Sequence, residues 1–237
     1  MKNEVYIRHI ENQSIHWWFQ ARKKIIESII KKKIRKKIRI LDYGSGSGVN
    51  ITMLSKFGFV SIYEPHQNTN AYLKLKYKNK NKFEVLSKIK NQKFDLIILA
   101  DVLEHIKDDL KTINKLSKNL NKNGHILITV PAYKFLFSKK DIILGHYRRY
   151  NSKELVRIFK RFSVQKLSYF NFFLFIPISI LILFFKIFRI NFINDVEKAP
   201  NHLLNKIMYK IFLGERTILS FFDLPFGISI IGLFKKK

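Results

Sequence analysis

The chain has 237 residues, of which 47% are hydrophobic and 14% aromatic, so wholesale disorder is excluded. Its length suits one large domain or one domain with an elaboration. The 45 lysines and arginines against 17 acids give a formal charge of +28, which attracts nucleic acid or an anionic membrane surface. Without cysteine there is no disulfide, thiolate metal ligand or cysteine nucleophile. Residues 1–5 carry an acid and lead into no apolar run, so we expect no secretory signal and a cytosolic protein.

Apolar side chains recur every three or four residues between Ser14 and Arg39, which predicts an amphipathic helix inside an N-terminal cap, residues 1–38. Short apolar runs then alternate with helical patterns. The predicted strands cover residues 39–43, 59–64, 83–86, 94–100 and 125–130, and the predicted helices cover residues 49–57, 66–78 and 106–120. This alternation of apolar strands and helices indicates a parallel sheet covered on both faces.

The second half predicts a helix from Asn151 to Arg161 and strands over residues 162–170 and 228–234. Between these strands lie an uncharged apolar run, interrupted by Pro177, and an amphipathic helical segment over residues 201–222. The sequence therefore predicts an α/β fold with a doubly wound, mostly parallel sheet of seven strands. Residues 1–170 and 224–237 would form the main domain, and residues 171–223 an apolar and amphipathic helical insertion.

Three glycines, Gly44, Gly46 and Gly48, follow the first predicted strand. Such a loop lets the backbone approach a ligand and aims helix N-terminal amides at it. A dinucleotide fingerprint would need its third glycine where Val49 stands, and the P-loop lysine is absent. Glu64, at the end of the second strand, is placed to accept hydrogen bonds from a ribose diol. The pattern favours an adenosine-type ligand without pyrophosphate.

At these residues the sequence resembles the class I S-adenosylmethionine-dependent methyltransferases, which have a Rossmann-like fold. The matching segments are Ile40–Gly48, Tyr63–Pro65 and Phe94–Ile106. The chain is also similar to a membrane-associated subgroup of bacteria and archaea with three further segments, here His16–Arg22, Val130–Tyr150 and Leu224–Ser229. The resemblance covers almost the whole chain.

The resemblance implies S-adenosylmethionine as the methyl donor. The residues it assigns to the donor are Asp42, Gly44, Ser45, Gly46, Gly48, Glu64 and Asp101. Asp42 would orient the amino group, the glycines would pass under the methionine part, and Glu64 would hold the ribose. Family members often place an acid after the third strand to meet the adenine amine, and this chain has Leu86, Ser87 and Lys88 there. Trp17, Trp18 and Arg22 are either a lid, with Arg22 on the donor carboxylate, or core anchors.

Methyl transfer from a sulfonium mainly requires alignment of the nucleophile and exclusion of water, and a hydroxyl acceptor benefits from a base. His105 and His146 are the candidate bases, because histidine titrates near neutral pH, and Tyr147 is a third catalytic candidate. The alternative for His105 is a structural hydrogen bond to a neighbouring turn. Tyr133, Arg148, Arg149 and Tyr150 are the candidate acceptor-binding residues.

Arginine forks suit phosphate or carboxylate recognition, so Arg148 and Arg149 favour an acceptor with an anionic portion. The alternative is a surface loop in which an arginine pairs with Asp141 or Glu154. Asp101, Glu104 and His105 have the spacing of metal ligands, with His146 as a fourth. No second histidine pairs locally with His105, so the sequence favours a site without a metal.

The apolar run is bounded at each end by basic residues, and both of its ends lead into the same predicted sheet. A single crossing would put these ends on opposite sides of a bilayer, and residues 201–222 are too charged to return. We therefore expect an in-plane or re-entrant insertion, bent at Pro177, on an anionic membrane. The alternative is burial of the run in a homodimer.

The sequence thus predicts a methyltransferase, peripheral at the inner face of the cytoplasmic membrane. Its acceptor would be a small or lipid-linked amphiphile methylated at oxygen. One alternative is an RNA methyltransferase that uses the basic surface, although the aromatics cluster in apolar stretches instead of interleaving with lysines as stacking platforms. The other is a non-catalytic membrane-binding scaffold that keeps a nucleoside pocket.

Overall fold

The computed structural model describes residues 12–34, 37–189 and 199–237. Residues 1–11 and 35–36 of the predicted cap, and residues 190–198 of the predicted insertion, lie outside the described residues. The strands are β1 (Ile38–Tyr43), β2 (Gly58–Tyr63), β3 (Phe83–Leu86), β4 (Phe94–Ala100), β5 (Leu120–Pro131), β6 (Phe162–Phe170) and β7 (Ser229–Lys236). The α-helices are α2 (Trp17–Lys33), α3 (Ile51–Leu54), α4 (Gln67–Lys76), α5 (Asp109–Lys118), α6 (Lys139–Leu144), α7 (Ser152–Ile158), α8 (Phe175–Ile187) and α9 (His202–Phe221).

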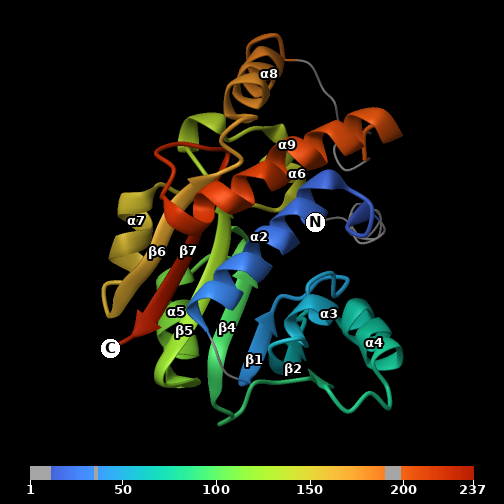
Figure 1. Cartoon of the computed structure of the whole chain (residues 1–237), viewed down its shortest axis with the longest axis vertical. Coiled ribbons are helices and arrows are strands. Elements are labelled where there is room, and N and C mark those ends of the chain that lie inside the picture. Colours follow the sequence, from blue (N-terminus) through green and yellow to red (C-terminus); the bar gives the residue numbers. More distant parts are fainter. Residues whose placement is uncertain (1–11, 35–36, 190–198) are drawn as a thin grey trace.

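The strands form one sheet in the order β3-β2-β1-β4-β5-β7-β6, which confirms the predicted seven-stranded fold. All strands run parallel except β7, which pairs antiparallel with both β5 and β6 (Figure 1). The strand order reverses between β1 and β4, and open α/β sheets bind ligands at the carboxyl ends of the strands at such a point. The topology therefore places the expected site beyond Tyr43 and Ala100.

Apolar residues on the central strands feed two cores, one on each face of the sheet. Successive side chains of a strand point to opposite faces, so Ile40 belongs to the core with α2, α4 and α9, whereas Leu41 faces the core with α5 and α7. Leu96 and Ile97 of β4 divide in the same way. This double burial explains why these strands read as continuous apolar runs.

Helix α9 lies side by side with α2 across one face of the sheet (Figure 1). The ring of Phe212 on α9 stacks on Trp18, with 5.0 Å between centroids, and meets Trp17 edge-on at 5.8 Å. Phe212 and Leu219 are fully buried. The amphipathic part of the predicted insertion is therefore built into the main core.

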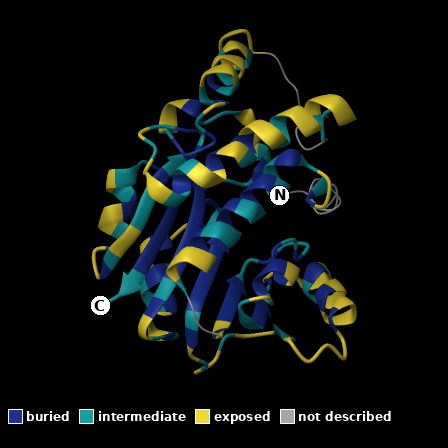
Figure 2. Cartoon of the chain, viewed as in Figure 1, coloured by how far each residue is buried: buried dark blue, intermediate teal, exposed yellow. Residues whose placement is uncertain are grey.

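Helix α8 projects beyond the carboxyl ends of the strands, and most of its surface is exposed (Figures 1 and 2). Ser179 is its one buried residue. Within the described residues no helix combines the length and the hydropathy that crossing a bilayer requires.

Four elements differ most from the sequence prediction. Strand β5, expected over residues 125–130, already begins at Leu120. The helix expected at residues 106–120 begins only at Asp109, because a short 3₁₀ turn occupies residues 103–105 and the Asp108 carboxylate accepts a hydrogen bond from Lys111 N at 3.0 Å. The helix expected at residues 49–57 shortens to α3. Helix α6, which the sequence analysis did not predict, begins with a capping box between Ser138 and Asp141.

Candidate active site

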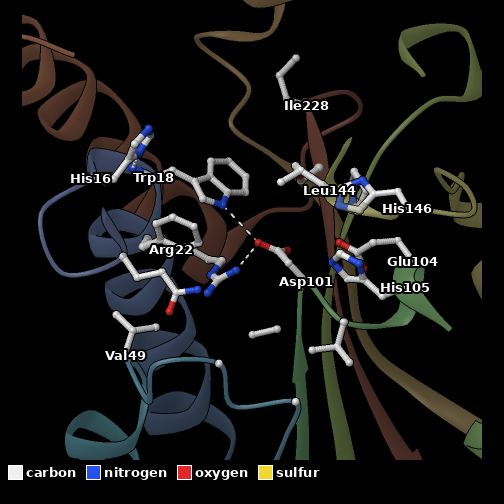
Figure 3. A pocket seen from close by; sticks show the side chains of 18 of the residues that line it. His16, Trp18, Arg22, Val49, Asp101, Glu104, His105, Leu144, His146 and Ile228 are labelled. Carbon is white, nitrogen blue, oxygen red and sulfur yellow. Dashed lines mark hydrogen bonds and ion pairs between the residues drawn. The ribbon is translucent and has the colours of Figure 1, made fainter. Parts of the chain in front are cut away.

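A cavity of about 410 Å³ opens at the carboxyl ends of β1, β2 and β4 (Figure 3). Residues from α2, α6, α8 and the loop before β7 also line it. Ligand pockets span roughly 300 to 1,000 Å³, so this volume suits one nucleoside-sized molecule with a small second group. The cavity lies at the switch point that the strand order predicts.

The glycine loop forms the floor of this cavity. Gly44, Ser45 and Gly46 line it, and Gly44 and Gly46 have φ angles of +72° and +53°. Gly46 N donates to Glu64 Oε2 at 2.8 Å, and His66 N donates to Glu64 Oε1 at 2.9 Å. The Glu64 carboxylate thus braces the loop while it lines the cavity. Because a carboxylate oxygen accepts more than one hydrogen bond, this position remains compatible with the predicted contact to ribose.

Two residues assigned to the donor do not line the cavity. Asp42 is 1% exposed, and burial raises its pKa to about 7. Gly48 has a φ of +80°, and a Cβ built on it would lie 2.7 Å from Ile51 Cδ1. The turn and the packing against α3 therefore account for a glycine at position 48, and its predicted contact with the donor stays a prediction.

Arg22 and Asp101 form an ion pair inside the cavity, and Figure 3 shows Trp18 and Arg22 converging on the Asp101 carboxylate. Trp18 Nε1 donates to Asp101 Oδ2 at 3.2 Å, and Thr129 Oγ1 donates to Oδ1 at 2.7 Å. Burial acts to raise the pKa of Asp101, but Arg22 and these hydrogen bonds outweigh it and hold the pKa below its usual value. Trp18 is thus both a core anchor and a cavity residue.

Several buried polar atoms on the cavity wall have no hydrogen-bond partner. They are Arg22 Nε, Asn50 Oδ1, Glu104 Oε2, and both side-chain polar atoms of Asn171. Each such atom costs about 1 to 3 kcal/mol while it stays unsatisfied. A ligand rich in donors and acceptors, such as a nucleoside joined to an amino acid, fits this wall.

Glu104, His105, Leu144 and His146 form the opposite side of the cavity, which we call the histidine wall (Figure 3). The rings of His105 and His146 meet edge-on with 4.6 Å between centroids. Each of Glu104, His105 and His146 offers an oxygen or nitrogen, and these atoms lie within 4.8 Å of one another. Burial, followed by the charge of Asp101, raises the pKa of Glu104 well above its usual value. The expectation of a site without a metal stays a prediction.

The arginines and tyrosines near residue 150 divide between the cavity and the interior. Arg149 lines the cavity, but its fork is occupied by Asp141, at 2.9 Å and 3.0 Å, which realises the ion-pair alternative. Arg148 donates to Asp109 Oδ2 at 2.9 Å and does not line the cavity. Tyr150 is 2% exposed and donates to the Leu103 carbonyl at 3.1 Å. Neither Arg148 nor Tyr150 lines the cavity, and their predicted roles in acceptor binding stay predictions.

Two further tyrosines also lie outside the cavity lining. Tyr147 is 57% exposed, and its backbone N donates to the Glu104 carbonyl at 2.8 Å. Tyr133 stacks on Tyr169, with 5.1 Å between centroids. The predicted roles of Tyr147 in catalysis and of Tyr133 in acceptor binding gain no support from these positions.

A family model described as a methyltransferase domain matches residues 11–168. The chain belongs to this methyltransferase family. Together with the seven-stranded sheet and its glycine loop, the match identifies a class I methyltransferase whose methyl donor is S-adenosylmethionine.

Relatives of this methyltransferase agree with the assignment. The ubiquinone biosynthesis O-methyltransferase of Pelagibacter ubique (strain HTCC1062) is 30% identical over 139 residues, which are 51% of this chain and 58% of the relative. The chain thus spans less than two thirds of that relative.

Solved structures show the same fold. The methyltransferase bound to the Trm112 activator from Haloferax volcanii superposes with a TM-score of 0.58 at 12% identity, covering 98% of this chain and 94% of that one. The N-methyltransferase NodS from Bradyrhizobium japonicum WM9, solved with S-adenosylhomocysteine, gives 0.55 at 10% identity, covering 91% and 86%.

Sequence reasoning missed several cavity residues of the methyltransferase, among them Asn50, Leu144, Asn171, Ile178 and Ile182. Asn50 lies two residues after Gly48, and its position next to the glycine loop was a usable signal. Ile178 and Ile182 are four residues apart, so they share one face of α8. Nothing in the sequence shows that this face turns toward the cavity, because the apolar run is apolar on every side.

Proposed function

We propose that this methyltransferase methylates an oxygen of an amphiphilic or lipid-linked acceptor while it lies on the anionic inner face of the cytoplasmic membrane. The observation that carries the proposal is the double role of α8. Ile178 and Ile182 line the cavity, whereas Ile180 and Ile187 on the same helix are 63% and 72% exposed. One helix therefore separates the cavity from a wide apolar surface.

That apolar surface includes exposed large apolar residues of both α8 and α9, two helices of which Figure 2 shows much to be exposed. Its exposed members are Phe173, Ile176, Ile180, Leu181, Phe184, Ile187, Phe188, Leu203, Leu204, Ile207, Ile211, Phe221 and Phe222. Large contiguous apolar patches on a soluble protein mark sites of protein or membrane interaction. We call this set the apolar patch.

The charges around the apolar patch favour anionic lipid as its partner. Lys186, Arg189, Lys206, Lys210 and Arg216 are exposed on or next to the same two helices. A basic residue close to an anionic leaflet contributes about 1 kcal/mol, and buried apolar side chains add to this. A helix with this composition suits docking in the plane of the membrane.

The size of the cavity supports an acceptor whose tail lies elsewhere. A volume of about 410 Å³ accommodates the donor and a small head group, and leaves no room for a long chain. An apolar tail that leaves beside Ile178 and Ile182 would pass directly into the apolar patch. The name of the Pelagibacter relative, an O-methyltransferase, supports oxygen as the methylated atom.

The residues of this chain have separate tasks in the proposed reaction. When bound, S-adenosylmethionine supplies an already activated methyl group. The glycine loop with Glu64, and Arg22 beside Asp101, would hold this donor. Trp18 and α8, which line the cavity, would exclude water from it. The histidine wall faces the space left for the acceptor hydroxyl. A residue of this wall would accept the proton that the hydroxyl loses.

Flotation with vesicles tests the membrane part of the proposal. We expect vesicles of phosphatidylcholine and phosphatidylglycerol to retain the protein at low salt, and Ile180→Glu/Phe184→Glu/Ile187→Glu to abolish retention. A matched control, Leu110→Glu/Leu75→Glu/Val156→Glu, changes three exposed apolar residues outside the patch by the same charge. Deletion of residues 171–222 is unsuitable, because Phe212 and Leu219 belong to the core.

Two results would contradict the membrane proposal. One is equal retention of the patch variant and its control. The other is a stable dimer of the wild type in solution that is replaced by a monomer in the patch variant, because the patch would then be a subunit interface.

A further inference from the structure

A short motif links α6 to the histidine wall. Helix α6 ends at Leu144 and is capped by Gly145, whose φ of +76° turns the chain back toward the helix. The backbone N of His146 then donates to the Asp141 carbonyl at 2.8 Å. Arg149 follows three residues later in the chain. The sequence Asp-x3-Gly-His-x2-Arg therefore brings three charged or titratable side chains together within nine residues.

Asp141 is the centre of this motif. Its Oδ1 faces His146 Nδ1 at 2.9 Å and accepts from Arg149 Nε at 2.9 Å, while Oδ2 accepts from Arg149 Nη2 at 3.0 Å and from Ser138 N at 2.9 Å. The side chain is 1% exposed. Burial acts to raise the pKa of Asp141, but the hydrogen bonds from His146 and Arg149 outweigh it and hold the pKa far below its usual value. Asp141 thus stays an anion that only accepts hydrogen bonds.

An anionic partner fixes the tautomer of a neutral histidine. Because Asp141 can only accept, the proton of the His146 ring lies on Nδ1, and Nε2 carries the basic lone pair. His146 lines the cavity, where its ring meets that of His105. A base oriented by a buried carboxylate is the arrangement that activates hydroxyl groups in many unrelated enzymes.

We propose that His146 is the general base for the acceptor hydroxyl, and that Asp141 and Arg149 are its positioning residues. The acceptor oxygen forms its bond to the methyl carbon as the bond from that carbon to the donor sulfur breaks. The hydroxyl proton passes to His146 Nε2 and later to solvent, and the donor leaves as a neutral thioether. This step rests on the proposed function, which supplies a hydroxyl acceptor.

The ion pair with Asp141 explains the position of Arg149, so that no anionic group on the acceptor is needed to explain it. A guanidinium whose fork is occupied by a buried carboxylate has little left to offer an acceptor phosphate. Its role is to keep Asp141 ionised, and through Asp141 to keep His146 in one orientation.

The test follows methyl transfer from labelled S-adenosylmethionine into a bacterial total lipid extract across about pH 6 to about pH 9. General-base catalysis contributes roughly 10² to 10⁴ in rate, so we expect kcat of His146→Ala to fall at least about 100-fold. Imidazole added to the buffer should restore part of the rate. Calorimetric affinity for S-adenosylmethionine should be unchanged. For Asp141→Asn we expect a smaller fall in kcat and an acid limb of the pH profile at lower pH.

Asp108→Asn is the matched control, because Asp108 is an exposed carboxylate that caps α5 and asparagine caps equally well. A merely structural role for Asp141 would lower stability without moving the pH profile. Wild-type kcat in His146→Ala, or a loss that imidazole does not restore, would overturn the proposal. So would calorimetric binding of Zn²⁺ that depends on Glu104 and His146, since the ion would occupy Nε2.

Nitrogen-15 NMR of the histidine rings separates this inference from the proposed function, because it needs no acceptor. We expect the Nδ1–H tautomer for His146 in the wild type at neutral pH and a mixture of tautomers in Asp141→Asn. An Nε2–H tautomer in the wild type would overturn the base assignment. If the tautomer is as expected and the wild type labels no lipid, the acceptor class is wrong instead.

Discussion

The two sides of the cavity are built in different ways. We define the donor side as Gly44, Gly46, Glu64, Arg22 and Asp101. Most of these residues lie just after the carboxyl ends of central strands, and β1, for example, is paired with a neighbouring strand on each side. The histidine wall and α8 come from a 3₁₀ turn, a short helix and an apolar projection beyond the sheet. The donor side could therefore be predicted largely from local sequence, whereas the acceptor side depends on tertiary contacts between elements outside the central strands.

The largest expected effect concerns Asp42, behind the donor side. Its pKa is raised from 3.8 to about 7 by burial, so its neutral form stabilises the fold fully below about pH 4. This stability is lost as the pH rises to about 7, a difference of roughly 4 kcal/mol. Asp42→Asn stays neutral. In urea titrations, we expect the free energy of unfolding of Asp42→Asn minus that of the wild type to rise by up to roughly 4 kcal/mol between about pH 4 and about pH 8. A constant difference across this range would contradict the assignment.

Next in size is the loss of the Glu64 brace. Glu64→Ala removes the acceptor of two backbone amides, those of Gly46 and His66. Hydrogen bonds to charged groups contribute about 1.5 to 3 kcal/mol each, so calorimetry should show donor affinity reduced about 100-fold or more. The control is Asp223→Ala, an exposed acid outside the cavity. An unchanged affinity of Glu64→Ala for S-adenosylmethionine would show that Glu64 does not contribute to donor binding.

Gly48 tests whether the third glycine serves packing instead of the ligand. Gly48→Ala places a Cβ at a φ of +80° and 2.7 Å from Ile51 Cδ1, and we expect a cost of about 2 kcal/mol. In Gly214→Ala, where the new Cβ meets nothing within 4 Å on helix α9, stability should rise by about 0.5 to 1 kcal/mol. Thermal unfolding of both variants measures this contrast. Equal shifts would contradict it.

The smallest expected effect is on the acceptor side. Ile182→Glu introduces a charge where α8 faces the cavity. In detergent micelles, which remove the need for membrane docking, we expect the KM for a lipid acceptor to rise about 10-fold, since a desolvated charge costs more than 1 kcal/mol. Donor affinity should not change. The exposed strand residue Val164, changed to Glu, is the control. A loss of donor affinity in Ile182→Glu would mean that the two sides are not independent.

The contrast also explains what the sequence could predict. All seven strands were predicted, but from different signals: β4 is an almost continuous apolar run that is buried along most of its length, whereas the edge strand β6 alternates and is partly exposed. Helix α6 was missed because six residues carry no apolar stripe, although the capping pair Ser138 and Asp141 was a usable signal. The three glycines look alike in sequence and all have positive φ. They differ only in the fold, where Gly44 and Gly46 line the cavity and Gly48 packs against Ile51 instead.

Neighbouring residues near position 150 show the same limit. Arg148 and Arg149 are adjacent in sequence, yet one pairs with Asp109 on α5 and the other with Asp141 on α6. Which arginine reaches the cavity depends on where these two acids lie in the fold, and composition carries no trace of that. His146 was a candidate from its residue type alone, and its partner became visible only in three dimensions.

The central claim is that the cavity passes a methyl group to an acceptor delivered from the membrane beside α8. The most direct measurement is mass spectrometry of a bacterial lipid extract after incubation with the enzyme and S-adenosylmethionine carrying a deuterated methyl group. We expect a lipid-soluble product that carries the deuterated methyl group on oxygen. With vesicles as the source of the acceptor, this product should not form when the enzyme carries Ile180→Glu/Phe184→Glu/Ile187→Glu. Label found only in RNA or in water-soluble molecules, from an enzyme that binds its donor, would contradict it.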